Sequence, residues 1–361
     1  MVDSLPDRPR KGRGAVSNET GRYEAQKRVV VDDGWAGDPA DDGPPPLRTV
    51  VARDTSRTVI SRNASPDVPF DRSINPYRGC EHGCIYCFAR PTHAWLGLSP
   101  GLDFETKLFA KFDAARLLEA ELAKPSYTPD VIALGTNTDP YQPVERRFGI
   151  TRSILEVLAR ARHPVTIVTK AQLVTRDLDI LAPMAREGLV KVFVSVTTLE
   201  PALARKLEPR ASRPALRLET IRRLAQAGVP TGVLAAPMIP ALNDGEMDAI
   251  LEAASEAGAE AAGYILLRLP LEIKDLFIEW LEAHFPDRKA HVLSLLRDMR
   301  GGGLYQSAWG KRMRGGGVYA DLLARRFELA CKRLHLNERD RPLDTTRFRR
   351  PVMPGDQLAL F

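Results

Sequence analysis

The chain has 361 residues, of which 44% are hydrophobic and 27% are charged, values typical of a folded globular protein rather than a fibrous or disordered one. No apolar stretch approaches the ~18 residues that a transmembrane helix needs, and the first residues lack the apolar segment of a secretory signal. We therefore expect no membrane association. The formal net charge of +6 favours polyanionic partners such as nucleic acid.

Residues 1–47 are rich in Asp, Gly, Pro and Arg and poor in large apolar side chains. Such a composition buries too little apolar surface to order a chain, so it predicts a disordered N-terminal tail. The charge is segregated: four basic side chains come early, at 8, 10, 11 and 13, and five aspartates come later, at 32, 33, 38, 41 and 42. Two interpretations stay open: the basic part contacts nucleic acid, or the whole tail is solvated.

Residues 48–270 alternate short β-branched runs with amphipathic stretches. We expect strands at 73–78, 131–134, 165–169, 191–196, 229–236 and 262–267, and helices at 113–124, 150–162, 177–187, 214–228 and 244–258. Pro214 and Gly228 suit the first helical position and the position just after a helix. Regular alternation of this kind predicts a parallel sheet built from right-handed βαβ units. Functional residues of such folds gather where the strands end.

The pattern changes after residue 270. Residues 271–335 predict a helical extension, with helices at 271–284, 288–300 and 318–334 around a glycine-rich loop, and residues 336–361 predict an extended tail. Residues 288–314 carry seven basic side chains against one acid, with Tyr305 and Trp309 between them. Basic groups follow phosphates and aromatic rings stack on bases, so this segment is a candidate nucleic-acid contact. The alternative is a solvated basic loop whose aromatic rings belong to the core.

Three of the four cysteines lie within eight positions in a C-x3-C-x2-C pattern: Cys80, Cys84 and Cys87. An odd cluster of thiols argues against a disulfide framework and, with no export signal, indicates the reducing cytoplasm. Thiolates in this spacing bind zinc, copper(I) or an iron–sulfur cluster. Zinc would need a fourth ligand from His82, His93 or Cys331, whereas a [4Fe–4S] cluster with one open iron would not. The pattern alone also permits three buried thiols.

The cysteine pattern, with Tyr86 immediately before the last thiol, resembles the cluster loop of the radical S-adenosylmethionine (SAM) superfamily. The resemblance implies a partial (β/α)6 TIM-like barrel of parallel strands over 48–270, followed by the helical extension. It also implies that Cys80, Cys84 and Cys87 hold a [4Fe–4S] cluster whose open iron chelates SAM. One electron, from a reductant such as flavodoxin or ferredoxin, then cleaves SAM to methionine and a 5′-deoxyadenosyl radical.

The segment GTNTDPYQPVE at 135–145, directly after the second expected strand, resembles the spore photoproduct lyase-like branch of that superfamily, described as DNA repair photolyases. The similarity continues through 168–174 and 193–219. Carried over residue by residue, it implies SAM contacts from Tyr86, Thr138, Asp139, Lys170, Ser195 and Arg217. From the residues alone, 139–140 is also an ordinary turn and Lys170 an ordinary surface charge.

One departure from that branch concerns the hydrogen-atom donor. Spore photoproduct lyase returns a hydrogen atom to its substrate radical from a cysteine near the second strand, and the corresponding GTNT stretch has no cysteine. The remaining thiol, Cys331, lies in an apolar helical context that predicts a core position. Radical formation is therefore a firmer expectation than repair of the spore photoproduct itself.

The last five residues, QLALF at 357–361, resemble the peptide by which bacterial repair and replication proteins dock on the sliding clamp. Leu360 and Phe361 would fill an apolar pocket while Gln357 hydrogen-bonds its edge. The alternative is that Leu358 and Phe361 pack back on the domain.

Three functions follow from these features. The first is a lyase-like radical SAM enzyme that acts on nucleic acid, in a role such as repair of a DNA lesion. The second is a radical SAM enzyme that acts on a peptide or small molecule. The third is a non-catalytic cluster-binding adaptor at the sliding clamp. The match around Thr138, Lys170 and Ser195 disfavours the third, while the basic segment and the tail favour the first over the second.

Overall fold

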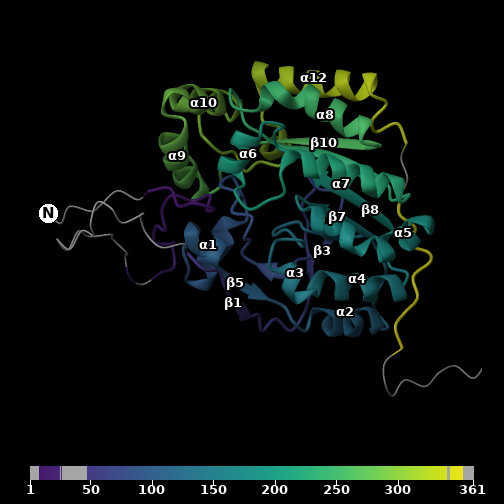
Figure 1. The fold of residues 1–361 in the computed structure, drawn as a ribbon. Coiled ribbons are helices and arrows are strands. Elements are labelled where there is room, and N and C mark those ends of the chain that lie inside the picture. The colour runs from purple at the N-terminus through teal and green to yellow at the C-terminus, as the bar shows by residue number, and fades with distance from the viewer. Residues whose placement is uncertain (1–7, 25, 27–46, 340–341, 353–361) are drawn as a thin grey trace, which may run out of the picture.

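A seven-stranded sheet lies at the centre of the computed structural model, which describes residues 8–24, 26, 47–339 and 342–352 (Figure 1). Its order is β10–β9–β8–β7–β6–β3–β2. The strands are β2 (Ile60–Arg62), β3 (Arg72–Ile74), β6 (Ile132–Leu134), β7 (Val165–Thr169), β8 (Val190–Ser195), β9 (Thr231–Met238) and β10 (Ala261–Leu266). All pair in parallel except β2, which runs antiparallel to β3. The predicted parallel sheet is confirmed, with β10 and β2 as its edges.

Helices follow the strands in sequence and pack side by side around the sheet (Figure 1). They are α2 (Ala114–Ala123), α4 (Ile150–Arg160), α5 (Leu178–Arg186), α7 (Pro214–Gln226) and α8 (Met247–Glu256). In α4 the buried Ile150, Ile154 and Leu158 recur every four residues and so share one face. Pro214 opens α7, and Gly228 adopts the left-handed φ of +76° just beyond its end, as the sequence predicts.

The first expected strand, at 73–78, is two short strands in different sheets. β3 ends at Ile74, and β4 (Tyr77–Arg78) begins a second sheet in the order β1–β5–β4, with β1 (Val50–Arg53) and β5 (Lys107–Ala110). Pro76 has no N–H to continue a ladder, and its carbonyl instead accepts from the Lys111 N–H at 3.0 Å. The small sheet therefore carries the chain from the main sheet into the cysteine loop.

The predicted helical extension is present as α9 (Ile273–His284), α10 (Pro286–Met299), α11 (Lys311–Arg314) and α12 (Val318–Arg333). Trp280 on α9 is fully buried, and its Nε1 donates to the Lys206 carbonyl in α6 (Pro201–Leu207) at 3.1 Å. The extension therefore shares a core with the parallel sheet. Among the described helices, none is both long and apolar enough to cross a membrane.

The expectation of a disordered N-terminal tail is wrong for residues 8–24, hereafter the N-terminal strap. Ala15, Val16 and Ser17 are 0%, 2% and 1% exposed. Farther along, the ring of Tyr23 lies 4.8 Å from that of Trp95. The strap is buried through its backbone and small side chains, and composition does not detect burial of that kind. The rest of the expected tail, apart from residues 26 and 47, lies outside the described residues.

Residues 342–352, hereafter the C-terminal strap, run along the amino ends of the strands. Asp344 N–H donates to the Gly188 carbonyl before β8 at 2.9 Å, and Arg349 N–H to the Ala161 carbonyl before β7 at 2.7 Å. The Phe348 ring lies 5.6 Å from Tyr127 and 5.5 Å from His163, measured between ring centroids. The described part of the tail is not extended throughout, because the chain turns at 334–337 and again at 345–347, where the Asp344 carboxylate accepts from the Thr346 N–H at 2.8 Å. The QLALF segment at 357–361 lies outside the described residues.

Candidate functional site

The three clustered cysteines lie in the loop that leaves β4, at the carboxyl end of the parallel sheet. Cys80 and Cys84 are 6% and 7% exposed, and Cys87 is partly buried. Backbone hydrogen bonds hold both ends of the loop: Cys80 N–H donates to the Phe104 carbonyl at 2.9 Å and Ile85 N–H to the Leu207 carbonyl at 3.0 Å. The thiols therefore project from a fixed backbone, where parallel α/β folds place their chemistry.

A buried ion pair organises the inside of this loop. Arg90 in η1 (Arg90–Leu96) and Glu105 in α1 (Leu102–Thr106) have fully buried side chains, and Nη2 of Arg90 donates to Oε1 of Glu105 at 2.5 Å. The same guanidinium donates to the carbonyls of Cys84 at 2.9 Å and Gly83 at 3.1 Å. Because carbonyls in a loop lack ladder partners, Arg90 supplies the donors that fix the middle cysteine.

Burial sets the protonation of the thiols. It raises the pKa of Cys84 to about 12, that of Cys80 well above its ordinary value, and that of Cys87 as well. The carboxylates of Asp139 and Glu208 add to the increase at Cys80 and Cys84, whereas the Lys170 ammonium opposes it at Cys84. Such thiols are neutral at pH 7 until a cationic metal centre displaces their protons.

The chemistry of this donor set, three thiols in one loop, fits an iron–sulfur cluster. A cubane spreads three thiolates over three irons, so its ligands need not converge on one point. Two of the side chains considered as a fourth zinc ligand each have a nitrogen beside another group. His82 Nδ1 lies 3.4 Å from an Asp139 oxygen, and His93 Nε2 lies 2.9 Å from the Lys107 carbonyl oxygen.

Asp139 connects the cysteine loop to two strand ends. Its Oδ1 accepts from the Thr169 hydroxyl at 2.7 Å, and its Oδ2 accepts from the Lys170 N–H at 2.7 Å. Burial would raise the pKa of this carboxyl, but His82 and these hydrogen bonds lower it overall. The neighbouring Thr138 hydroxyl donates to the Tyr77 carbonyl at 2.8 Å. Both side chains are thus occupied within the protein and position the loop after β6.

Tyr86, Lys170 and Ser195, three of the sequence-predicted SAM contacts, come from the cysteine loop and from the ends of β7 and β8. The Lys170 Nζ lies 5.7 Å from the centre of the buried Tyr86 ring. The Tyr86 hydroxyl lies 3.3 Å from the Thr197 hydroxyl, two residues beyond Ser195. The structure therefore brings Lys170 and Thr197 to the Tyr86 side chain, and Ser195 ends the strand that leads to Thr197.

Arg217, another predicted SAM contact, is 2% exposed and directs its guanidinium into the protein. It donates to Oε2 of Glu208 at 2.5 Å, to the Ser195 carbonyl at 3.1 Å and to the Ser212 carbonyl at 2.7 Å. Burial alone would raise the pKa of Glu208, but Arg217 and Lys170 lower it to about 2. Arg217 thus neutralises a buried carboxylate and fixes the backbone at Ser195.

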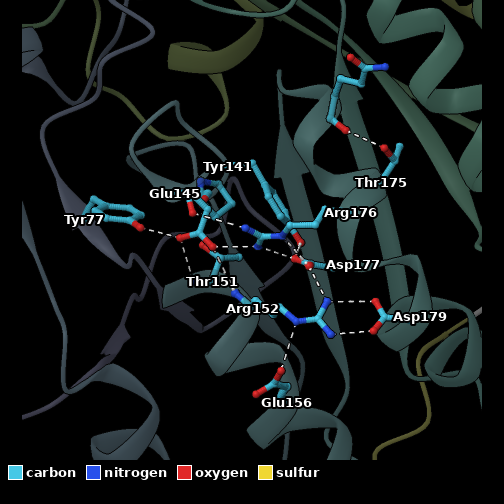
Figure 2. A network of polar contacts seen from close by, with 12 residues as sticks. Tyr77, Tyr141, Glu145, Thr151, Arg152, Glu156, Thr175, Arg176, Asp177 and Asp179 are labelled. Atoms are coloured by element: carbon cyan, nitrogen blue, oxygen red, sulfur yellow. Dashed lines mark hydrogen bonds and ion pairs between the residues drawn. The ribbon is translucent and has the colours of Figure 1, made fainter. Parts of the chain in front are cut away.

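A second polar network underlies the segment at 135–145, and Figure 2 shows it. Glu145, fully buried, accepts from the Tyr77 hydroxyl at 2.5 Å and from Arg176 at 2.9 Å. Arg176 also donates to Asp177 at 2.7 Å, and Asp177 accepts from the Tyr141 hydroxyl at 3.1 Å. Tyr141 and Glu145 therefore join the loop after β6 to η2 (Gln172–Asp177) and to β4. Their part in this motif is structural.

One arginine–aromatic pair lies directly after the cysteine loop, and a second lies within the glycine-rich loop of the extension. Phe88, directly after Cys87, is 41% exposed, and the Arg268 guanidinium carbon lies 5.0 Å from its ring centre. Arg268 follows β10. Arg312 lies 4.1 Å from the centre of the Trp309 ring, which is 57% exposed. Cation–π pairs of this kind hold flat, positively charged surfaces ready for stacking.

The basic segment at 288–314 is less available than its sequence suggests. Arg300 is 3% exposed and donates to the carbonyls of Leu267, Lys311 and Arg312. Arg312 forms an ion pair with Asp67. Arg300 therefore shapes the glycine-rich loop, and Arg312 fixes that loop to the segment before β3. Two of the seven basic side chains are thus engaged within the protein.

Sequence reasoning missed Arg90, Glu105 and Gln142. Gln142 accepts from the Glu81 N–H at 2.9 Å and donates to the Gly79 carbonyl at 3.1 Å, at the start of the cysteine loop. Single Arg, Glu and Gln residues are mostly exposed, so nothing local marks these three. Phe88 was detectable, since it adjoins a cysteine of the motif. Cys331 is 7% exposed within α12, as predicted for a core residue.

Comparison with known proteins agrees with this arrangement. The family model of the Radical SAM superfamily matches residues 74–254, half of the chain. An uncharacterised protein of Mycobacterium tuberculosis (strain ATCC 25618 / H37Rv) is 39% identical over 232 residues, 64% of this chain and 68% of that protein. An uncharacterised protein of Methanocaldococcus jannaschii is 27% identical over 173 residues, 48% of this chain and 62% of that protein.

The fold is similar to that of spore photoproduct lyase. The structure of that enzyme complexed with dinucleoside spore photoproduct aligns with a TM-score of 0.55 and 16% identity over 79% of each chain. A double mutant of the same enzyme, with bound AdoMet and dinucleoside spore photoproduct, aligns with a TM-score of 0.52 and 16% identity, over 79% of this chain and 78% of that one. At 16% sequence identity, the similarity to this enzyme extends to the fold alone.

A parallel α/β sheet with a three-cysteine loop at its carboxyl edge defines a class of cluster-dependent enzymes. The chain belongs to the radical SAM superfamily, whose members use a [4Fe–4S] cluster and SAM. The predicted superfamily, fold class and cofactors are confirmed.

We predict that Glu208→Gln lowers the free energy of unfolding of the apoprotein by about 3–5 kcal/mol, because it leaves the buried Arg217 charge without its partner. Urea denaturation followed by circular dichroism measures the change. The matched control is Glu219→Gln, which breaks the exposed pair with Arg222 and should cost less than about 1 kcal/mol. Equal losses in the two variants would contradict the structural role of the Glu208–Arg217 pair.

Proposed function

We propose that Cys80, Cys84 and Cys87 hold the [4Fe–4S] cluster of this radical SAM enzyme and that Lys170 and Ser195 face the bound SAM. The observation that carries the proposal is the contact of the cysteine loop with the ends of β7 and β8, where Tyr86 lies beside Lys170 and Thr197. When bound, the reduced cluster supplies one electron to SAM, which yields methionine and a 5′-deoxyadenosyl radical.

The chain's own residues have distinct parts in this proposal. Lys170 provides the positive charge for the SAM carboxylate. Its ammonium group lies over the ring of Tyr86, which belongs to the same loop as the thiols. Asp139, Thr138 and Arg217 hold the strand ends in position rather than contact SAM, since their polar groups are already paired. Buried thiols and a reduced cluster suit the cytoplasm, with flavodoxin or ferredoxin as the electron donor.

Replacement of Cys80, Cys84 or Cys87 by Ala is expected to abolish stable cluster binding, since each change removes one of three iron ligands. Anaerobic reconstitution followed by iron and sulfide analysis measures occupancy, and 5′-deoxyadenosine formation with dithionite measures SAM cleavage. Cys331→Ala is the matched control and should keep both. Full occupancy in Cys84→Ala, or loss of the cluster in Cys331→Ala, would refute the ligand assignment.

We propose nucleic acid as the substrate class, and a DNA lesion as the form of it. The support is the arginine–aromatic pair of Phe88 and Arg268 beside the cysteine loop, together with the exposed Trp309 ring in the glycine-rich loop. Rings stack on bases and guanidinium groups contact phosphates. Spore photoproduct lyase, which shares the fold, binds a dinucleoside photoproduct. The stretch at 135–138 has no cysteine to return a hydrogen atom, so the lesion differs from the spore photoproduct.

A peptide or small-molecule substrate is the second candidate, because nothing in the SAM half of the site depends on the substrate. The two candidates differ in how binding responds to salt. A peptide or small molecule lacks the repeated backbone phosphates of a nucleic acid, so its affinity would not fall steeply as the salt concentration rises. A purely adaptor role would show the cluster but no 5′-deoxyadenosine.

Phe88→Ala and Arg268→Ala are expected to weaken single-stranded DNA binding about 5- to 150-fold each, since a stacked base contributes about 1–3 kcal/mol. Fluorescence anisotropy with a labelled oligonucleotide at several salt concentrations measures affinity. Arg116→Ala on α2, with a side chain 70% exposed, is the control and should bind like the parent protein. Unchanged affinity in both rim variants, with the cluster intact, would exclude this surface as the nucleic-acid site.

We also propose that residues 357–361 dock on a bacterial sliding clamp. The support is the QLALF pattern and the course of the C-terminal strap, which holds residues 344 and 349 at the amino ends of the strands.

Truncation after Asp356 should reduce clamp affinity by about 30-fold or more, since the apolar anchors of such a peptide contribute about 2 kcal/mol or more each. Surface plasmon resonance on an immobilised bacterial clamp measures binding. Cluster content and SAM cleavage should match those of the full chain. A truncated protein that unfolds, or that binds the clamp as before, would refute docking through these residues.

A further inference from the structure

The N-terminal strap lies directly against the cysteine loop. Gly14 touches Gly83 backbone to backbone: a Cβ added at Gly14 would lie 1.8 Å from the Gly83 carbonyl oxygen. Gly83 has a φ of +68°, and a Cβ there would lie 2.7 Å from Oε2 of Glu105. Two glycines facing each other permit this approach, and no larger residue fits either position without displacement.

The strap and the loop share one buried carboxylate. Glu105 accepts from the Gly14 N–H at 3.0 Å, from the Ala15 N–H at 2.8 Å and from Arg90 at 2.5 Å. Arg90 in turn donates to the Cys84 carbonyl. A continuous path of three hydrogen bonds therefore runs from the strap, through Glu105 and Arg90, to the middle cysteine.

Arg90 has no capacity left for other partners. Its remaining nitrogen, Nη1, donates to the Pro100 carbonyl at 3.0 Å and to the Gly101 carbonyl at 2.9 Å, so all five of its N–H groups have acceptors. If the strap left, Glu105 would lose two of its donors and the segment that covers its carboxylate. Water could then reach the ion pair and weaken the contact between Glu105 and Arg90, the residue that holds the loop.

Further contacts keep the strap in place. The Leu102 N–H donates to the Ser17 carbonyl at 3.2 Å, and Asn18 exchanges hydrogen bonds with Asp103 at 2.8 and 3.0 Å. Arg13 donates to the Glu105 carbonyl at 3.0 Å. These contacts all lie on α1 and its flanks, so the strap binds along the element that carries Glu105.

We infer that the N-terminal strap forms one side of the cluster site. Glu105 is a positioning residue: it binds the strap and, through Arg90, fixes the backbone of Cys84. The inference rests on the proposed assignment of the three cysteines, but the packing of strap on loop does not require a bound cluster. The strap fixes the loop before the cluster is present and covers the loop's Gly83 side afterwards, which restricts water and oxidant.

The first test uses Gly14→Ala, which forces the strap off Gly83, and Gly245→Ala as the control, because a Cβ at Gly245 would meet nothing within 4 Å. Hydrogen–deuterium exchange of the apoprotein, read by mass spectrometry, reports on peptides covering 80–90. The exchange rate there should rise about 10-fold or more in Gly14→Ala, because the loop opens locally more often once the strap no longer packs on it. Peptides from β7 and β8 should not change. Unchanged exchange at 80–90 would overturn the inference.

The second test follows the reconstituted cluster in air by its visible absorbance. Gly14→Ala and Glu105→Gln should lose the cluster several-fold faster than the parent and Gly245→Ala. Asn18→Ala, a milder change at a partly buried contact, keeps the test open if Glu105→Gln does not fold. Equal rates in all variants would overturn the inference. If the parent protein takes up no cluster, the cysteine assignment fails, while the exchange result still decides whether the strap holds the loop.

Discussion

The site depends on the buried ion pair between Arg90 and Glu105. Both side chains are fully buried, and two charges in such a place are costly unless every remaining donor and acceptor is paired. Here the remaining groups pair with backbone: carbonyls of the cysteine loop on one side and N–H groups of the N-terminal strap on the other. The pair therefore makes two irregular segments, far apart in the sequence, into one rigid unit around the thiols.

The same arrangement recurs where the other loops leave the sheet. Glu208 with Arg217 fixes the chain after β8, and Glu145 with Arg176 fixes the loop after β6. Backbone groups at strand ends have left the hydrogen-bonded ladder and need other partners. Buried carboxylates and guanidinium groups provide several partners each from one position. The loops around the candidate cofactor site are thus held by side-chain networks, and these networks lie along the carboxyl edge of the parallel sheet.

The sequence predicts the parallel sheet, its helices and the cysteine loop because these depend on local periodicity and spacing. It does not predict features decided by distant pairing. The break of the first strand at Pro76 depends on β5, which lies beyond the whole cysteine loop in the sequence, and the order of the N-terminal strap depends on Glu105. Arg217 shows the same limit: the motif marks it as important, but only the fold shows that its charge belongs to Glu208.

The two straps lie at opposite ends of the parallel strands, and this separation constrains how the protein can work. The N-terminal strap packs on the cysteine loop, at the carboxyl ends (Figure 1). The C-terminal strap is hydrogen-bonded at Gly188 and Ala161, just before β8 and β7 begin. The two straps are therefore separated by the length of the strands: residues 8–24 pack where the cysteine loop lies, and residues 342–352 pack where the strands begin. A change in the C-terminal strap is thus not expected to disturb the backbone that carries the three thiols.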